Sequence, residues 1–431
     1  MRARAGQKLS APRGRTLVVA AAIVVGAILL LATGGGSSVD AKPPPVPATP
    51  PPSAAPPRSI EWPVAWCKLK PHTDPAVVAV ASTSPWGYDA ATDRGHQEPF
   101  VNGDGLRLCA DLAVNETDHR LWPLDPRTGS SGGADSDAAA TAAAGAAAVA
   151  AVAAGRTVTV FLTASDTPHV LAFVRNVTAA HTTARFTLVA HNSDFAYPHR
   201  ADAAASAAAD ALAAMPAVAA VYAQNLALPR DATGAAKHFP LPIGVENRYN
   251  PYGKSWHTYM RHACRASRRR PTGQRKKLLL VSIARVHTAS ADRTALLRAA
   301  KALAAAAPDL VTIATYKTLE EYLSAVSEHV FVAAPRGNGW DTHRAYDGWM
   351  MGAFVVTKRG PLDSLYGRLP SLLLGDWGEL TLPALTAARE RLLAGLAAGT
   401  LDVAPELLTA RHWRTALFPG NVGRSPLCPG P

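Results

Sequence analysis

The chain has 431 residues, enough for two or three domains, and a net charge of +12 at neutral pH. Five Lys/Arg lie within residues 1–15 and eight within 261–277, and neither block contains an acid. Outside these two blocks the chain is nearly neutral. This distribution argues against a general nucleic-acid-binding surface, so no nucleic-acid partner is expected.

The four cysteines are Cys67, Cys109, Cys264 and Cys428, and none belongs to a Cys-x-x-Cys pair. A structural zinc site is therefore not expected. An even number of cysteines fits two disulfides in an oxidising compartment, with Cys67 and Cys109 as the first candidate pair. Four reduced thiols are the alternative.

An uncharged, mostly apolar segment follows the basic tail. Residues 17–32 are almost wholly apolar, and residues 16–36 together reach the roughly 20 residues that cross a bilayer. A basic tail at 1–15 stays on the cytosolic side of such a segment, so the rest of the chain would be translocated. A cleaved signal peptide has a shorter apolar run, usually about 7–15 residues, and a transit peptide is amphipathic. These remain alternatives to a transmembrane signal anchor at 16–36.

A proline-rich stem is predicted at 37–60, because the run KPPPVPATPPPSAAPP reads as an extended polyproline spacer. Residues 60–135 show no clear periodicity and are predicted to be loop-rich. The sequons at Asn115 and Asn176 are compatible with a lumenal location but carry little weight in a chain of this length.

Strands and helices then alternate in two series. The first series, in a lobe at 61–260, has predicted strands at 157–162, 185–190, 218–223 and 237–243 and helices at 138–154 and 202–214. The second, in a lobe at 278–431, has strands at 278–283, 311–315, 330–334, 354–357 and 372–374, with helices at 291–306, 319–327, 342–351, 379–396 and 405–413. The basic segment 261–277 is predicted to link them. Alternation of this kind predicts an α/β fold with mostly parallel sheets, here two Rossmann-like lobes facing across a cleft.

Polar residues follow the predicted strands of the first lobe. His191 and Asp194 follow one strand, Gln224 and Asn225 follow the next, and Glu246 follows the last. The ligand crevice of an open α/β sheet lies at such strand ends. Structural roles in polar turns are the alternative for each of these residues.

The densest group of polar residues and glycines lies in residues 331–357, where a buried strand leads into a Gly-rich turn and a helix. Gly337 and Gly339 allow a ligand to approach the backbone closely. Asp341 or Thr342 can cap the helix, whose N-terminus is a natural phosphate site. Cationic donors surround that site, and an acid one turn further on can accept hydrogen bonds from ribose hydroxyls; these residues are Arg336, His343, Arg344 and Asp347. A Gly-rich turn with solvent-exposed arginines is the alternative.

This segment resembles the donor-binding half of the exostosin-like glycosyltransferases. The matching positions are Pro335, Arg336, Gly337, Gly339, Asp341, Arg344, Tyr346, Asp347 and Gly352. The continuation is most similar to the branch containing the ribitol xylosyltransferase C-terminal domain, through residues 362–366, Leu369-Pro370 and Asp376-Trp377. The resemblance covers roughly 155–400. The sequence departs from the pattern where Asp347 replaces the family's Glu, Tyr346 its Trp and Trp349 its Leu, and the small residue after the acid is Gly348.

The resemblance implies a two-lobed GT-B architecture and inverting transfer of a sugar from a nucleotide-sugar donor to a glycan or glycoprotein acceptor. The expected donor-binding residues are Arg336, Gly337, Gly339, Asp341, His343, Arg344 and Asp347. The catalytic base is expected from the first lobe, with Asp194 and His191 as candidates. No cofactor or essential metal is expected, since the α/β part has no Asp-x-Asp triplet. Gln224, Asn225 and Glu246 are candidates for the acceptor side.

Such an enzyme would be a single-pass type II protein of the Golgi or endoplasmic reticulum membrane, held there by its N-terminal helix. A non-catalytic lumenal binding or scaffold protein on the same fold is the main alternative. A phosphotransferase is a further alternative, against which the missing P-loop lysine motif speaks.

Overall fold

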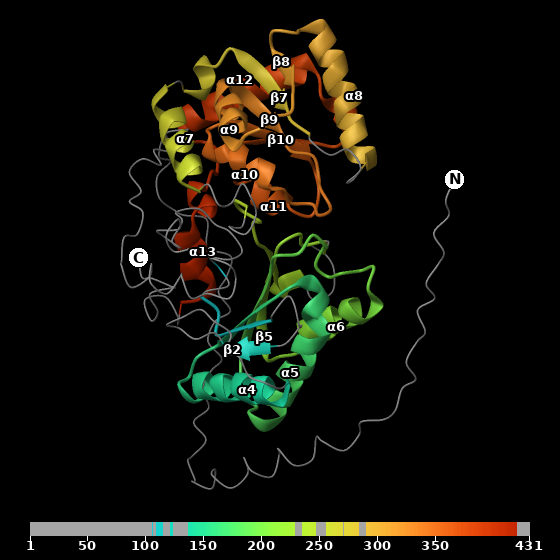
Figure 1. Ribbon diagram of the computed structural model, residues 1–431, viewed down its shortest axis with the longest axis vertical. Helices are drawn as coiled ribbons and strands as arrows, with labels where there is room; N and C mark the ends of the chain where they lie inside the picture. The colour runs from blue at the N-terminus through green and yellow to red at the C-terminus, as the bar shows by residue number, and fades with distance from the viewer. Residues whose placement is uncertain are drawn as a thin grey trace, which may run out of the picture. The chain divides into compact units, whose positions relative to one another are not determined.

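The computed structural model describes residues 106, 109–114, 121–123, 137–228, 235–246, 256–269, 271–283 and 290–419 (Figure 1). The predicted tail, anchor and stem lie outside these residues. Within the described part, no helix combines the length and the apolar character needed to span a membrane. The described chain is α/β and contains two sheets, one of six strands and one of five, which confirms the predicted fold class at that level.

The first sheet has the order β2-β1-β3-β4-β5-β6. Its strands are β1 (Leu112–Val114), β2 (Leu121–Pro123), β3 (Val158–Leu162), β4 (Phe186–Ala190), β5 (Val218–Ala223) and β6 (His238–Pro240). Only the β1–β2 pair is antiparallel. The region predicted to be loop-rich therefore contributes β1 and β2. Each has three residues, too few to show an alternating pattern.

Three helices pack beside this sheet: α4 (Asp137–Ala153), α5 (Thr167–Ala180) and α6 (Ala203–Ala214) (Figure 1). Helix α5 contacts both α4 and α6. Strands β3 to β6 follow one another in the same direction, and right-handed connections then place their linking helices on one face. Helix α5 was not predicted. It follows a capping box between Thr163 and Asp166 and buries an apolar stripe of Val170, Phe173, Val174 and Val177.

The second sheet is wholly parallel and has the order β11-β10-β9-β7-β8. Its strands are β7 (Lys277–Val281), β8 (Val311–Ile313), β9 (His329–Ala333), β10 (Phe354–Lys358) and β11 (Ser371–Leu374). The chain passes from β7 to β8 on one side and then returns to place β9 on the other side of β7. The switch point of the topology, where ligands of such sheets bind, therefore lies between β7 and β9.

The helices of this half are α7 (Trp256–Arg269), α8 (Ser290–Ala306), α9 (Leu319–Glu328), α10 (His343–Met350), α11 (Asp363–Tyr366), α12 (Leu382–Ala398) and α13 (Ala410–Leu417). Helix α9 packs against both α7 and α10, and α8 packs on β8. Most of the predicted basic linker, 261–277, is thus helix. The helix buries Tyr259, Ala263 and Ala266 on one face, while the basic side chains obscure that pattern in the sequence.

One residue of the basic segment is structural rather than exposed. The Arg275 guanidinium is buried and donates to the carbonyl oxygens of His329 and Met351, both at 2.7 Å. Cys109 and Cys264 are disulfide-bonded, and the described residues include no free cysteine. The expectation of disulfides is confirmed for these two residues, whereas a pairing of Cys109 with Cys67 involves a residue outside the described part.

Candidate functional site

A cavity of about 440 Å³ lies at the carboxyl ends of β7 and β9, where the topology places the switch point. Its size is within the range of ligand pockets, about 300–1,000 Å³. We call it the interlobe cavity, because residues that follow strands of both sheets line it. From the first lobe come Asp194, Asn225, Ile243 and Glu246, and from the second come Ser282, Arg293, Thr315, Tyr316, Tyr322 and the loop and helix residues Gly337 to Gly339, Asp341 to Arg344 and Asp347.

The carboxylate of Asp341 joins the second lobe to the first. Its Oδ2 accepts hydrogen bonds from the backbone N–H of Ile243 at 2.7 Å and from the Tyr346 hydroxyl at 2.9 Å. Its Oδ1 accepts from the Thr342 N–H and from the Tyr366 hydroxyl. Burial raises the pKa of Asp341 to about 6, against the opposing effect of these donors. Because both oxygens are engaged, Asp341 holds the loop in place and has little capacity left for a ligand.

Gly339 is required by a contact with the first lobe. A Cβ at this position would overlap with the Asn225 carboxamide. Asn225 accepts from the Asp341 N–H at 2.7 Å and donates to the Ser193 carbonyl at 3.0 Å, and its backbone is left-handed with φ 55°. At Gly337 a Cβ would meet only ordinary contacts, the nearest at 3.5 Å from an Arg293 nitrogen. Of the two predicted glycines, Gly337 is therefore the one with room for a ligand beside it.

Two arginines line the interlobe cavity, together with four acidic residues. The pKa of Arg293, on α8, is lowered by burial and then by the charge of Arg344, on α10. Arg293 donates from Nε to the Arg336 carbonyl at 3.2 Å. Helix α10 begins at His343, and the buried Thr342 hydroxyl before it has no hydrogen-bond partner within the described residues. The neighbouring Asp292 has the opposite effect on the pKa of Arg293. Guanidiniums and a helix N-terminus are groups that can bind an anion.

Asp347 is a buried acid in the same cavity, 6% exposed. Its Oδ1 makes no hydrogen bond within the described part of the chain. Burial raises the pKa of Asp347 to about 7, although Arg344 and the hydroxyls of Tyr259 and Tyr322 lower it. Glu246 adds a further upward effect, and burial raises its own pKa as well. The unused oxygen can accept a hydrogen bond from a ligand hydroxyl.

One end of the cavity is aromatic. Tyr316 and Tyr322 lie with their ring centroids 6.1 Å apart, and Tyr259 and Leu319 line the same space. Asp347 interacts electrostatically with Tyr259 and Tyr322 and with Arg344, so it connects the aromatic residues with the cationic ones. The cavity therefore combines aromatic rings, a buried acid and two arginines.

The two predicted catalytic residues are placed differently. Asp194 lines the cavity, is exposed, and accepts a hydrogen bond from Asn338 at 2.8 Å. His191 is buried and does not line it; its Nε2 lies 3.0 Å from the Pro242 carbonyl oxygen and its Nδ1 contacts Asn192. Burial lowers the pKa of His191 to about 4. Only Asp194 is positioned to meet a ligand there.

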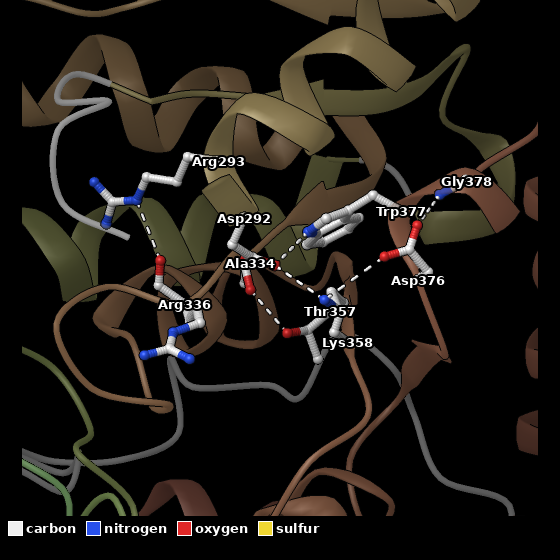
Figure 2. Close-up of polar contacts among 9 residues, drawn as sticks. All are labelled: Asp292, Arg293, Ala334, Arg336, Thr357, Lys358, Asp376, Trp377 and Gly378. Atoms are coloured by element: carbon white, nitrogen blue, oxygen red, sulfur yellow. Dashed lines mark hydrogen bonds and ion pairs between the residues drawn. The ribbon is translucent and has the colours of Figure 1, made fainter. Parts of the chain in front are cut away.

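His343 lies at the start of α10 and lines the cavity, and its Nδ1 is 2.8 Å from the Gly244 carbonyl oxygen. Burial lowers its pKa, so the neutral ring is favoured, with the proton on Nδ1. Arg336, by contrast, lines a second cavity of about 480 Å³ and not the interlobe cavity. Figure 2 shows its side chain turned away from Arg293, which reaches the Arg336 backbone.

Sequence reasoning missed Arg293, Tyr259 and Tyr322. Arg293 lies in the first turn of the helix after β7, the first strand of the second lobe, where the crevice of such sheets is expected. This position in the sequence could have indicated Arg293 as a site residue. The tyrosines belong to helices with no motif of their own, and only the packing of α7 against α9 brings them to the cavity.

The described residues form an α/β protein with two sheets, and a cavity lined by two arginines and four acidic residues lies at the switch point of the second sheet. No family model matches the sequence, and no curated protein shows significant similarity to it. The assignment of a function therefore depends on the residues of the crevice.

Proposed function

We propose that the protein is an inverting glycosyltransferase of GT-B architecture that uses a nucleoside diphosphate sugar, with UDP-sugars the first candidates. The observation that carries the proposal is the composition of the interlobe cavity. Arg293, Arg344 and the start of α10 supply positive charge, Asp347 supplies a buried acceptor, and the first lobe supplies Asp194. The resemblance of residues 331–357 to the exostosin-like family supports the same assignment.

In this mechanism the donor diphosphate lies against Arg293, Arg344 and the N–H groups at the start of α10. The nucleotide ribose donates to Asp347, and the base lies against Tyr316 and Tyr322. As the acceptor oxygen bonds to the anomeric carbon, the bond from that carbon to the phosphate oxygen breaks, and the nucleoside diphosphate leaves with the electron pair. The arginines stabilise the negative charge that develops on this leaving group.

Asp194 takes the proton of the acceptor hydroxyl in the same step. Asp194 belongs to the first lobe and the residues proposed to hold the diphosphate belong to the second, so we place the acceptor on the face of the sugar that points away from the diphosphate. A single displacement of this kind inverts the anomeric configuration. Asn338 holds the Asp194 carboxylate through one oxygen and leaves the other for the acceptor.

The proposed location is the Golgi or endoplasmic reticulum membrane, with the two lobes in the lumen. The apolar segment 16–36 would anchor the chain, and the proline-rich stem would hold the lobes away from the bilayer. The disulfides of Cys109 and Cys264 are in keeping with an oxidising lumen.

The test measures UDP binding by calorimetry and UDP release from a panel of UDP-sugars, using the purified full-length protein. Arg344→Gln should weaken UDP binding by about ten- to a hundredfold, since hydrogen bonds to charged groups contribute about 1.5–3 kcal/mol. Arg298→Gln, an exposed arginine on α8, is the control and should bind as the parent protein does. A folded parent protein that binds no nucleotide would sink the proposal.

The main alternative, a non-catalytic binding protein, differs in one measurable respect. It would bind UDP-sugars in the same cavity without transfer, and Asp194→Asn would change nothing. Asp347 in place of a glutamate is the observation that favours it, because the shorter side chain reaches less far into the cavity. Sugar transfer that depends on Asp194 excludes this alternative.

A further inference from the structure

The second cavity lies at the carboxyl ends of β9, β10 and β11, and all its lining residues belong to the second lobe. The loop after β9 separates it from the interlobe cavity. Arg336 and Trp340 of that loop line the second cavity, whereas Gly337 and Gly339 line the interlobe cavity. We call this space, of about 480 Å³, the C-lobe cavity.

Four of the five charged residues that line the C-lobe cavity have an ion-pair partner. Lys358 lies 3.3 Å from the Asp292 carboxylate and 3.7 Å from that of Asp376 (Figure 2). The Trp377 indole donates to the same Asp292 oxygen at 2.9 Å. Asp363 accepts from the Gly360 N–H at 2.8 Å and pairs with Arg359 at 3.6 Å. Three carboxylates disfavour an anionic ligand, and Lys358 between two of them disfavours a cation.

A rigid aromatic and guanidinium surface forms another wall. The Arg336 guanidinium carbon lies 4.8 Å from the centroid of the Trp340 ring, and the ring edge packs closely against Gly360. The Arg336 Nε is buried and has no hydrogen-bond partner within the described residues. Ala291, Ala295 and Leu362 add apolar surface. The cavity therefore offers fixed donors, fixed acceptors and apolar patches at once.

This combination matches the chemistry of a neutral sugar ring. Each sugar hydroxyl both donates and accepts, so carboxylates and a guanidinium can bind neighbouring hydroxyls. The C–H faces of the ring need apolar partners such as Ala291, Ala295 and Leu362. An inorganic anion or a metal ion would use only part of this set.

We propose that the C-lobe cavity is a subsite for a neutral sugar unit of the acceptor glycan, outside the reaction centre. Asp194, the proposed base, lines the other cavity, so the bond-forming step takes place there. The C-lobe cavity adjoins it through the Arg336–Trp340 loop and can hold a further sugar of the same glycan chain. The assignment of this sugar to an acceptor rests on the proposed function. The binding of a sugar in the cavity does not depend on it.

Ala295→Leu tests the subsite by filling it without changing a charge. Ala302→Leu, at an exposed position on the same helix, is the matched control. The probes are the methyl glycosides of glucose, galactose, N-acetylglucosamine and xylose, observed by saturation-transfer NMR on the full-length protein in a detergent without a sugar head group. They are measured with and without saturating UDP. UDP and UDP-sugar affinities are measured in parallel.

We expect at least one glycoside to bind the parent and Ala302→Leu proteins and to bind Ala295→Leu at least about tenfold more weakly, with UDP affinity unchanged. Asp376→Asn, at an exposed position, should weaken the binding of the same glycoside. Asp309→Asn, an exposed control, should leave that binding unchanged. No glycoside binding to the parent, or equal binding to Ala295→Leu, overturns the subsite.

Two further outcomes separate the proposals. If Ala295→Leu lowers the affinity for a UDP-sugar but not the affinity for UDP, the cavity holds the sugar of the donor, and the assignment to the acceptor is wrong. If the parent protein binds a glycoside but no nucleotide, the sugar subsite stands while the proposed transferase function fails.

Discussion

The interlobe cavity and the C-lobe cavity share one loop but differ in charge. In the interlobe cavity, Arg293 and Arg344 repel each other, and Asp347 is buried with an unused oxygen. In the C-lobe cavity, Lys358 is already paired with Asp292 and Asp376. A buried carboxyl oxygen without a hydrogen bond marks a place where a ligand can supply the missing donor, whereas an ion-paired lysine suits a neutral ligand. Substitutions in each cavity should therefore have different effects.

The largest expected effect is on turnover. Asp194→Asn keeps the size of the side chain and its capacity to accept from Asn338 but removes the base. Transfer should fall by about 10²–10⁴-fold while UDP affinity stays the same. Steady-state rates and calorimetry on the same preparation check this, with Asp202→Asn, the cap of α6, as a control for charge. Full activity in Asp194→Asn would place the base elsewhere.

Asp347→Asn should change the pH dependence of stability. The folded protein raises the pKa of Asp347 from 3.8 to about 7, so the stability contributed by its protonated form is complete below about pH 4. As pH rises from 4 towards 7, Asp347 ionises in the unfolded chain but stays protonated in the folded protein. Ionisation therefore favours the unfolded chain, and this contribution to stability is lost. The loss is at most about 4 kcal/mol, at roughly 1.4 kcal/mol per pKa unit.

Because Asp347→Asn cannot titrate, its free energy of unfolding should fall less steeply between pH 4 and 7 than that of the parent. Urea denaturation across this range measures the difference. UDP binding should weaken at the same time, because a carboxylate that accepts from ribose is lost. A pH profile identical to that of the parent would contradict the role of burial at this residue.

Gly339→Ala and Gly337→Ala test the shared loop as a matched pair. The added Cβ at 339 meets the Asn225 carboxamide, so the loop must shift, at a cost of about 1–3 kcal/mol in the free energy of unfolding. At 337 the nearest contact is ordinary, and the effect on stability should be small. Denaturation curves compare the two variants. Equal destabilisation would mean that Asn225 does not hold the loop in solution.

The sequence predicted most strands of both sheets, because runs such as 278–283 and 330–334 are apolar and bounded by polar turns. It did not predict which way neighbouring residues of the loop face. Arg336 was expected at the donor site and lines the other cavity, while the adjacent Gly337 lines the interlobe cavity. His191 and Asp194 looked equivalent as polar residues after a strand. Only the packing against Pro242 shows that His191 is enclosed.

The smallest expected effect tests whether the two cavities are coupled. Tyr366 lines the C-lobe cavity, and its hydroxyl donates to Asp341, which fastens the loop to Ile243 of the first lobe. Tyr366→Phe removes one neutral donor from a buried carboxylate and should cost about 1–2 kcal/mol in the free energy of unfolding. With one donor fewer, the pKa of Asp341 should rise further above its usual range, so the loss of stability with rising pH should become steeper.

Tyr366→Phe should also lower the affinities for UDP and for the glycoside by a similar small factor. The loop that Tyr366 supports borders both cavities. UDP calorimetry and glycoside NMR on this variant measure the two effects. Tyr222→Phe, a tyrosine on β5 that lines neither cavity, is the control. If Tyr366→Phe affects the glycoside alone, the cavities are independent, and Tyr366 acts only as a wall of the C-lobe cavity.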